Sequence, residues 1–319
     1  MTERSPHVVV GSGPLGLTVV RELRARDHAV RVVNRRGVVP VPTDVEVVGA
    51  DVTDHDAARR ACEGAAVVYN CTNAPYTDWP TAFPPIWEGV LAGAAAADAV
   101  LVCAGNLYAY GAVDGPITED LPWDAETRKG RTRAEMARRV LDAHEAGVVR
   151  ATIGRGSDFF GPGVRDSVVG ERVFGNLLRG KRADVLGDPD LPHTYTYVED
   201  FGRALVTLGG DERAWGEVWH VPSPPTRSTR EFVECVADVV GVEPRMRAAP
   251  GWLIRLAGLV SPRMRELAEM RYEFEEPFVV SHEKFASTFD LEPTPYEDAI
   301  ERTVEWYRTD GVDSATSVA

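Results

Sequence analysis

Hydrophobic residues in the first half of the chain follow two alternating patterns. Short runs rich in valine predict buried β-strands, and longer stretches with an apolar residue every three to four positions predict helices. The predicted strands are residues 7–11, 29–34, 45–50, 65–72, 99–111 and 148–156, and the predicted helices are residues 14–27, the alanine-rich stretch before residue 99, and residues 134–147. Strands that alternate with helices predict an α/β fold, with a doubly wound parallel sheet and helices on both of its faces.

The second half of the chain has a different texture. Beyond residue 160, proline and glycine become more frequent and the hydrophobic runs become shorter. Two segments still predict sheet elements with a helix between them, and two or three helices are expected after Ser228. The expected organisation is a first domain over residues 1–160 with returning segments near 194–221, and a smaller second domain over residues 161–319 with a disordered tail from about residue 311.

A glycine-rich turn follows the first predicted strand and opens the first predicted helix. The first glycine of such a turn permits a tight bend, the second lets a pyrophosphate approach the backbone, and the third lets the helix pack against the strand. The free N–H groups and the positive end of the helix dipole also attract phosphate at this position. The spacing therefore predicts a dinucleotide-binding site rather than a glycine turn that binds nothing. Its residues are Gly11, Ser12, Gly13, Pro14, Leu15 and Gly16.

The end of the second predicted strand indicates which dinucleotide is bound. Enzymes that use NAD usually carry an Asp or Glu here, which accepts hydrogen bonds from the ribose. This chain instead has Asn34, followed by Arg35 and Arg36. Guanidinium groups bind a phosphate through two parallel hydrogen bonds. These residues favour NADP over NAD; the alternative is that both arginines are solvated in the loop.

Charge and composition exclude several classes of function. The 319 residues contain 35 Lys and Arg against 49 Asp and Glu, a formal net charge of −14. This charge disfavours nucleic acids and anionic membranes as partners, because both attract basic surfaces. No apolar run is long enough to cross a bilayer, and the first five residues leave no room for a signal peptide. The four cysteines and seven histidines show no metal-binding spacing, so we expect a cytoplasmic protein with free thiols and no metal site.

Seven further segments carry motifs of one enzyme family. They are residues 49–54, 70–75, 107–111, 154–163, 194–205, 216–223 and 299–308. With the glycine turn, they resemble the extended short-chain dehydrogenase/reductases, the NAD(P)-dependent epimerase/dehydratase group. The resemblance implies a Rossmann domain and a smaller C-terminal substrate domain, a small-molecule substrate in the cleft between them, and the homodimer that such relatives often form through a helix pair. It adds to the cofactor site Asp51 and Val52 at the adenine, Cys71, Thr72 and Asn73 beside the cofactor, Arg133 at the ribose, and Gly156.

The chain departs from this family at the positions that carry the chemistry. Relatives place a Tyr and a Lys four residues apart on one helix, and a Ser or Thr four residues before the tyrosine that is here Tyr110. Those positions are occupied by Lys129, Arg133 and Asn106. Arg133 can hold the ribose but cannot act as a base. Repulsion from Arg133 would lower the pKa of Lys129, which could then shuttle a proton or polarise a carbonyl as a cation. Tyr108, on the same side of the predicted strand as Asn106, is a further proton donor. The alternative is an exposed basic helix face and ordinary edge aromatics.

The residues expected to line the substrate pocket are mostly aromatic, which suits a neutral, partly apolar small molecule. Relatives that bind nucleotide sugars carry an arginine where this chain has His193, so a sugar nucleotide has no support. The leading hypothesis is an NADP-dependent oxidoreductase with an atypical acid/base set. The alternatives are a redox-neutral isomerase, lyase or cyclase on the same fold, and a non-enzymatic NADP-sensing binding protein. The candidate lining residues are Tyr76, Trp79, Asp158, Phe160, His193 and Tyr195.

Overall fold

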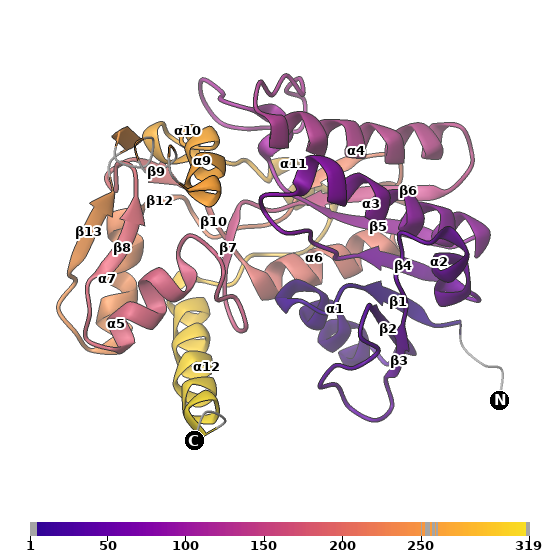
Figure 1. The fold of residues 1–319 in the computed structure, drawn as a ribbon, viewed down its shortest axis with the longest axis horizontal. Helices are drawn as coiled ribbons and strands as arrows, with labels where there is room; N and C mark the ends of the chain where they lie inside the picture. The colour runs from indigo at the N-terminus through magenta and orange to yellow at the C-terminus, as the bar shows by residue number, and fades with distance from the viewer. Residues whose placement is uncertain (1–4, 250, 253–255, 257–258, 260, 317–319) are drawn as a thin grey trace.

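The computed structural model describes residues 5–249, 251–252, 256, 259 and 261–316, and it arranges them in two lobes (Figure 1). The N-terminal half of the chain, together with residues 198–210, 218–220 and 283–288, forms the larger lobe, drawn on the right of Figure 1. The smaller lobe, on the left, is formed by residues from the second half.

A seven-stranded parallel sheet is the centre of the larger lobe. Its strand order is β11-β6-β5-β4-β1-β2-β3, and every neighbouring pair is parallel. The order reverses between β1 and β4, which is the position where open α/β sheets bind ligands at the carboxyl ends of the strands. The strands are β1 (His7–Val10), β2 (Val30–Asn34), β3 (Glu46–Gly49), β4 (Val67–Asn70), β5 (Val100–Gly105), β6 (Arg150–Arg155) and β11 (Val218–His220). The predicted α/β class is confirmed.

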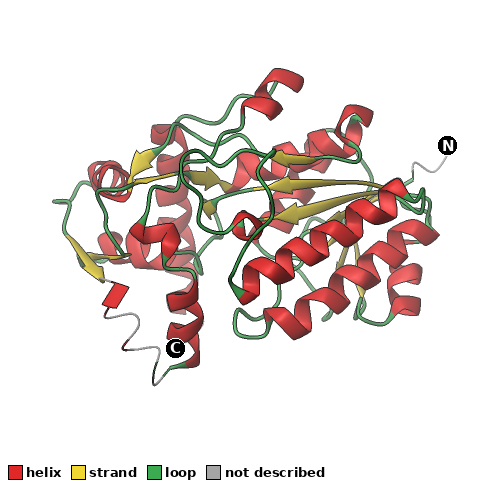
Figure 2. Ribbon diagram, turned by 90° about the horizontal axis from the view of Figure 1, so that it is seen from above, coloured by secondary structure: helices red, strands yellow, loops and turns green. Residues whose placement is uncertain are grey.

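Helices cover both faces of this sheet (Figure 2). Alternate residues of β1 enter two separate hydrophobic cores: Val8 and Val10 face one, and Val9 faces the other. Burial on both faces explains why the strands are continuous valine-rich runs. The first core is shared with α2 (His55–Cys62), α3 (Trp79–Ala96) and α4 (Arg128–Glu145), and the second with α1 (Pro14–Ala25), α6 (Val198–Gly210) and α11 (Glu283–Thr288).

The smaller lobe packs short strand pairs and helices around an aromatic core. The rings of Phe160, Phe174 and Phe232 lie within 5.1–6.1 Å of one another, centroid to centroid. Helix α7 begins with a capping box between Ser228 and Glu231. The strand pairs are β7 (Asp158–Phe160) with β10 (Tyr195–Tyr197), β8 (Ala183–Leu186) with β13 (Met246–Ala249), and β9 (Pro192–His193) with β12 (Arg227–Ser228); the helices are α5 (Asn176–Leu178), α7 (Thr229–Val240), α9 (Pro262–Glu269), α10 (Tyr272–Glu275) and α12 (Tyr296–Thr316).

Four local predictions differ from the structure. Strand β5 ends at Gly105, and Tyr108–Tyr110 form a 3-10 turn, η1, in which the Asn106 side chain accepts a hydrogen bond from the Tyr108 amide. Helix α4 begins at Arg128 rather than at residue 134, because Thr127 caps it. The described residues after Ser228 hold five helices, and α12 continues to Thr316 although an unstructured tail was predicted from about residue 311. Residues 317–319 lie outside the described part of the chain.

In the described segments, every helix is too short or too polar to cross a membrane.

Candidate functional site

The glycine turn between β1 and α1 has open space beside Gly13 and close backbone contacts at Gly11 and Gly16. Gly11 has φ of +106°, and a Cβ there would lie 2.5 Å from the Cys71 carbonyl oxygen. A Cβ on Gly16 would lie 2.0 Å from the Gly11 carbonyl oxygen, whereas one on Gly13 would meet nothing within 4 Å. Helix α1 then begins at Pro14 with no side-chain cap and no acidic residue in its first turn. The positive end of the helix therefore faces open space beside Gly13.

The end of β2 is organised by Asn34. Its side-chain amide donates to Ser12 Oγ at 3.0 Å and to the Val38 carbonyl at 3.1 Å. Its Oδ1 accepts from the amides of Arg36 (2.9 Å) and Gly37 (2.7 Å). Asn34 thus ties the loop to the glycine turn. Arg35 and Arg36 are both exposed beside it, and neither forms an ion pair with another described residue.

The other predicted cofactor residues divide into those at the edge of the sheet and those that pack inward. The hydrogen bonds that Asp51 accepts from the Thr53 side chain and amide lower the pKa of its carboxyl, and the nearby Arg35 charge adds to this. Thr72 donates to Asn70 Oδ1 at 2.6 Å in the loop after β4, where Cys71 is partly buried and Asn73 is exposed. Val52 is buried in the first core, and a Cβ on Gly156 would lie 2.6 Å from the Phe201 ring. These last two residues can offer only backbone to a ligand.

Lys129 and Arg133 are both on the first turns of α4 but belong to different networks. Arg133 Nε donates to Asn106 Oδ1 at 3.0 Å. Lys129 is fully buried, and its ammonium contacts the carboxylates of Glu266 and, at 3.6 Å, Glu269 on α9. Two carboxylates therefore face Lys129. Its main electrostatic interaction is attraction to them and not the predicted repulsion by Arg133. The exposed basic helix face that was the alternative is wrong for Lys129.

Arg133 lies against an aromatic wall. Its guanidinium carbon is 5.2, 4.8 and 5.5 Å from the ring centroids of Trp79, Phe83 and Trp87, which is cation–π geometry. Burial, together with the Arg155 charge, lowers the pKa of Arg133 to about 10, so it stays charged at neutral pH. Its Nη1 is buried and has no hydrogen-bond partner among the described residues. That N–H is an available donor at the end of β5.

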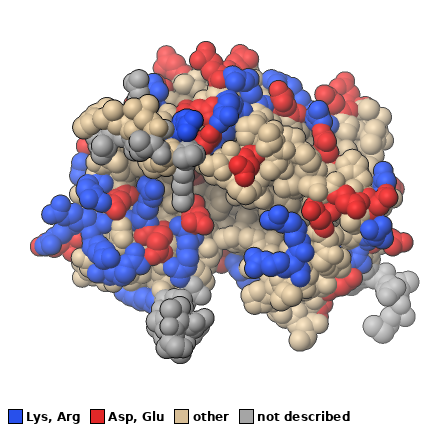
Figure 3. Space-filling view, in the orientation of Figure 1, with Lys and Arg blue, Asp and Glu red and all other residues tan. Residues whose placement is uncertain are grey.

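Polar side chains from both lobes meet beyond the ends of β4 and β5. The surface of the molecule is hollowed between the two lobes (Figure 3). Tyr76 follows β4 and Tyr108 lies in η1, and their side chains are hydrogen-bonded to each other. Asp158 begins β7, and Tyr272 and Glu273 come from α10 in the smaller lobe. We call these five residues the inter-lobe cluster.

Electrostatics keep most of the inter-lobe cluster uncharged. Burial, and then the Glu273 charge, raises the pKa of both Tyr76 and Tyr108. Burial and the Asp158 charge raise the pKa of Glu273 well above its ordinary value. Burial likewise raises the pKa of Tyr272, whose hydroxyl is buried without a hydrogen-bond partner among the described residues. The cluster therefore presents neutral hydroxyl donors.

The structure corrects part of the predicted substrate lining. Phe160 and Tyr195 are buried in the aromatic core of the smaller lobe, and the Tyr195 hydroxyl is bonded to Thr229 Oγ1 at 2.9 Å. Trp79 is also buried, but its ring packs 5.4 Å from Tyr76 and 5.7 Å from Tyr108, so it backs the cluster. Tyr108 is not on a strand, so the alternation argument that paired it with Asn106 is wrong, although η1 keeps the two residues adjacent.

Four residues of the site were not identified from the sequence: Glu266, Glu269, Tyr272 and Glu273. They lie on the short helices α9 and α10, of which α9 contacts the start of α4 through Lys129. No motif marks them. Their one sequence signal is a run of acidic residues between Glu266 and Glu276, a pattern that is equally typical of a solvated surface.

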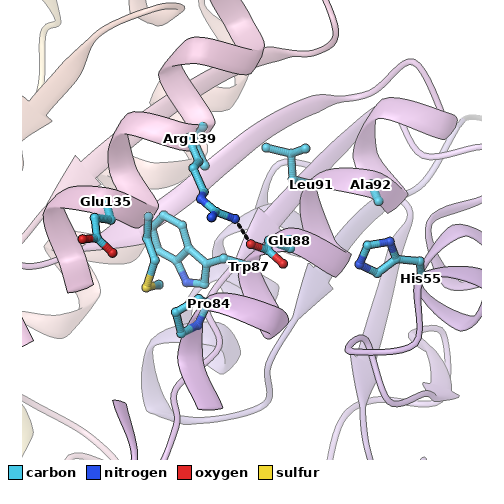
Figure 4. Close-up of a pocket in the computed structure, with 10 residues that line it drawn as sticks. His55, Pro84, Trp87, Glu88, Leu91, Ala92, Glu135 and Arg139 are labelled. Atoms are coloured by element: carbon cyan, nitrogen blue, oxygen red, sulfur yellow. Dashed lines mark hydrogen bonds and ion pairs between the residues drawn. The ribbon is translucent and has the colours of Figure 1, made fainter. Parts of the chain in front are cut away.

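A separate pocket of about 320 Å³ lies on the outer side of α3 and α4 (Figure 4). An exposed ion pair between Arg139 and Glu88 crosses it. Trp87 lines this pocket and also stacks with Arg133, so it forms the wall between the pocket and the strand ends. The described residues contain no group of three or more His, Cys, Asp or Glu side chains placed to hold a metal ion.

Comparison with known proteins decides the family. A model of the NAD dependent epimerase/dehydratase family matches residues 8–220, more than half of the chain. The chain belongs to this family. Membership places it among enzymes with redox-related chemistry. No curated protein sequence matches the chain.

Solved structures match this epimerase/dehydratase family member over nearly its whole length. Epimerase Mth375 from Methanothermobacter thermautotrophicus has a TM-score of 0.82 at 17% identity, covering 98% of this chain and 95% of its own. MoeE5 in complex with UDP-glucose and NAD has a TM-score of 0.77 at 20% identity, covering 96% and 99%. The dTDP-glucose 4,6-dehydratase DesIV from Streptomyces venezuelae, with NAD and TYD bound, has a TM-score of 0.78 at 19% identity, covering 95% and 97%. At these identities the likeness concerns the fold.

The residues present fit the dinucleotide that the family name implies. Open space beside Gly13 and the uncapped start of α1 suit a pyrophosphate. The unpartnered Nη1 of Arg133 suits a ribose hydroxyl at the neighbouring strand end.

Proposed function

We propose that this family member is an NADP-dependent oxidoreductase that acts on a small, neutral, partly apolar molecule. The observation that carries the proposal is the inter-lobe cluster: uncharged hydroxyl donors from two lobes meet beside a glycine turn suited to a dinucleotide. A bound nicotinamide ring would supply or accept a hydride. The protein's part is to hold the substrate oxygen and to move a proton.

The preference for NADP rests on the end of β2. Asn34 makes four hydrogen bonds within its own loop and the glycine turn, and it has no carboxylate to accept hydrogen bonds from a ribose. Arg35 and Arg36 are exposed beside this position without ion-pair partners in the described chain. Two free guanidinium groups suit a 2′-phosphate. The solved structures of MoeE5 and DesIV are named with NAD. A preference for NADP would therefore distinguish this chain from them.

A neutral substrate follows from the charges around the cluster. Asp158 is a member of the cluster, and an anionic group there would be repelled by its carboxylate. His193, at the position where sugar-nucleotide relatives carry an arginine, is buried and stacked against Phe274 and Phe278 at 5.6 and 5.1 Å. It is therefore not placed to grip a pyrophosphate. These features support a substrate without a nucleotide.

Each candidate catalytic residue has a distinct role in this proposal. The neutral hydroxyl of Tyr108 donates a hydrogen bond to the substrate oxygen, and Tyr76, hydrogen-bonded to Tyr108, orients that hydroxyl. Asn106 fixes the Arg133 guanidinium, whose free Nη1 holds the ribose. Lys129 lies 4.2 Å above the Tyr76 ring and supplies positive charge from within its ion pairs.

The test is oxidation of NADPH, followed at the nicotinamide absorbance, with a panel of small apolar ketones, aldehydes and quinones. Turnover with at least one member is expected, and Tyr108→Phe should lower kcat by about 100- to 1,000-fold, since a hydrogen-bond donor to the developing oxyanion is lost. Binding without any turnover would favour the NADP-sensing alternative. Product formed without a net absorbance change would favour the isomerase or lyase alternative.

A further inference from the structure

Asp158 of the inter-lobe cluster is paired with His193, which is buried in the smaller lobe. Asp158 Oδ2 lies 3.2 Å from His193 Nε2. The Asp158 side chain is 18% exposed and His193 only 4%. Asp158, a member of the inter-lobe cluster, is therefore the more accessible residue of the pair, and His193 lies deeper.

The second ring nitrogen of His193 fixes where the protons of this pair lie. His193 Nδ1 is 3.0 Å from the main-chain oxygen of Glu273. A carbonyl oxygen only accepts, so Nδ1 carries a hydrogen and donates it. A neutral imidazole would then present a bare lone pair at Nε2 to the Asp158 carboxylate, which is repulsive. The 3.2 Å contact is a hydrogen bond only when one further proton sits between Nε2 and Oδ2. The pair is built to hold that proton.

The other titratable groups around Asp158 are poor competitors for this proton. Burial raises the pKa of each tyrosine facing Asp158, so these hydroxyls hold their own protons at neutral pH. Burial together with the Asp158 charge raises the pKa of Glu273 as well. Lys129 is held by Glu266 and Glu269. The groups facing Asp158 are Tyr76 and Tyr108 from the larger lobe, and His193, Tyr195, Tyr272 and Glu273 from the smaller lobe.

We propose that the Asp158–His193 pair exchanges the substrate's proton in this enzyme, in the role that a tyrosine fills in related enzymes. Asp158 is the catalytic residue, and His193 is a positioning residue that holds the shared proton. The inference rests on the proposed oxidoreductase function. In the reductive direction, the substrate carbon gains a hydride, the carbonyl π pair moves to oxygen, and that oxygen takes the shared proton from the pair. Water then restores the proton. In the oxidative direction, the pair accepts the proton of the substrate hydroxyl.

The first test compares Asp158→Asn with the wild type in NADPH oxidation with the carbonyl panel. Asn keeps the size of the side chain, and Asp158 is partly exposed, so the variant should fold. Losing a general acid lowers kcat by about 100-fold or more, and we expect KM and the NADPH affinity to stay within a few fold. We also expect loss of one limb of the pH–rate profile. The matched control is Asp114→Asn, an exposed loop carboxyl, which should keep wild-type kcat. An Asp158→Asn enzyme with wild-type kcat and pH profile would overturn the proposal.

The second test does not depend on activity. In ¹⁵N-histidine-labelled protein with NADP⁺ bound, proton NMR should show two low-field protons from His193: the Nδ1 proton directed at Glu273 and the proton shared with Asp158. His193→Gln assigns both signals by removing them, and Asp158→Asn should remove only the shared one. A single low-field proton in the wild type would overturn the inference. If two protons are present but no carbonyl substrate is reduced, the proposed function fails while the proton-holding pair stands.

Discussion

The ion cluster between α4 and α9 should be a principal source of stability between the two lobes. Lys129 is fully buried in the larger lobe, and the Glu266 side chain, from the smaller lobe, is only 8% exposed. Removing one partner of a buried ion pair costs about 3–5 kcal/mol, because the other charge is left buried and unpaired. In Glu266→Gln, Glu269 stays 3.6 Å from the ammonium and the new amide oxygen still accepts a hydrogen bond. We therefore expect a loss of about 2–3 kcal/mol, below the full range.

The assay is thermal unfolding at pH 7 with Glu88→Gln as the matched control. For a chain of this length, 1 kcal/mol corresponds to about 2 °C in Tm, so Glu266→Gln should melt about 5 °C below the wild type. Glu88 and Arg139 form an ion pair on the same helix bundle, but their side chains are 41% and 65% exposed. Removing that pair should cost about 1 kcal/mol or less, and the cost should shrink with added salt.

A double substitution distinguishes loss of the Lys129–Glu266 ion pair from two independent destabilising effects. Lys129→Met removes the buried charge that Glu266→Gln strands, so the two together should cost less than the sum of the two alone. Equal Tm values for Glu266→Gln and Glu88→Gln, or strict additivity with Lys129→Met, would refute the account of the lobe contact.

Two further predictions concern the glycine turn and acid stability. Gly13→Ala should leave Tm near the wild-type value and weaken NADPH binding, because its Cβ enters the open space beside α1. Gly16→Ala should lower Tm as well, because its Cβ would lie 2.0 Å from the Gly11 oxygen. Thermal melts with and without NADPH distinguish the two variants, and equal Tm losses would contradict these roles of the two glycines. Burial lowers the pKa of His220 to about 3 from an ordinary 6.5. Below pH 6.5 the unfolded chain therefore binds a proton at His220 that the folded chain does not bind. The free energy of unfolding then falls by up to about 1.4 kcal/mol per pH unit. In urea unfolding, the stability difference between wild type and His220→Gln should therefore narrow as the pH falls from 7 to 4, and a constant difference would contradict it.

Local sequence patterns were sufficient for the sheet and for the glycine turn. Strands buried on both faces are continuous valine runs. The three glycines lie within one strand–turn–helix unit, where Gly16 packs closely against the Gly11 oxygen and Gly13 borders open space. Family spacing also brought Asn106 and Arg133 together correctly, and the structure joins them by a 3.0 Å hydrogen bond.

The remaining features depend on contacts between distant segments. Lys129 and Glu266 are 137 positions apart, and nothing local to either residue indicates that two carboxylates rather than Arg133 would face the lysine. Tyr272 and Glu273 enter the site because α10 packs against the larger lobe. The sequence predicts Phe160 and Tyr195 as aromatic residues in loops, but they lie on the paired strands β7 and β10 and are buried in the core of the smaller lobe. Such long-range packing has no period or motif in the sequence.

The most direct test of the central claim is a thermal-shift titration with NADP⁺, NADPH, NAD⁺ and NADH, repeated on Arg35→Ala/Arg36→Ala. A ligand present at about 100 times its Kd stabilises the native state by about 2.7 kcal/mol, which is about 5 °C in Tm for this chain. We predict that shift with NADP⁺ or NADPH, a much smaller one with NAD⁺ or NADH at the same concentration, and loss of the difference in the arginine variant. A larger shift with NAD⁺ or NADH would contradict the assignment of the arginines, and no shift with any of the four would contradict the dinucleotide site itself.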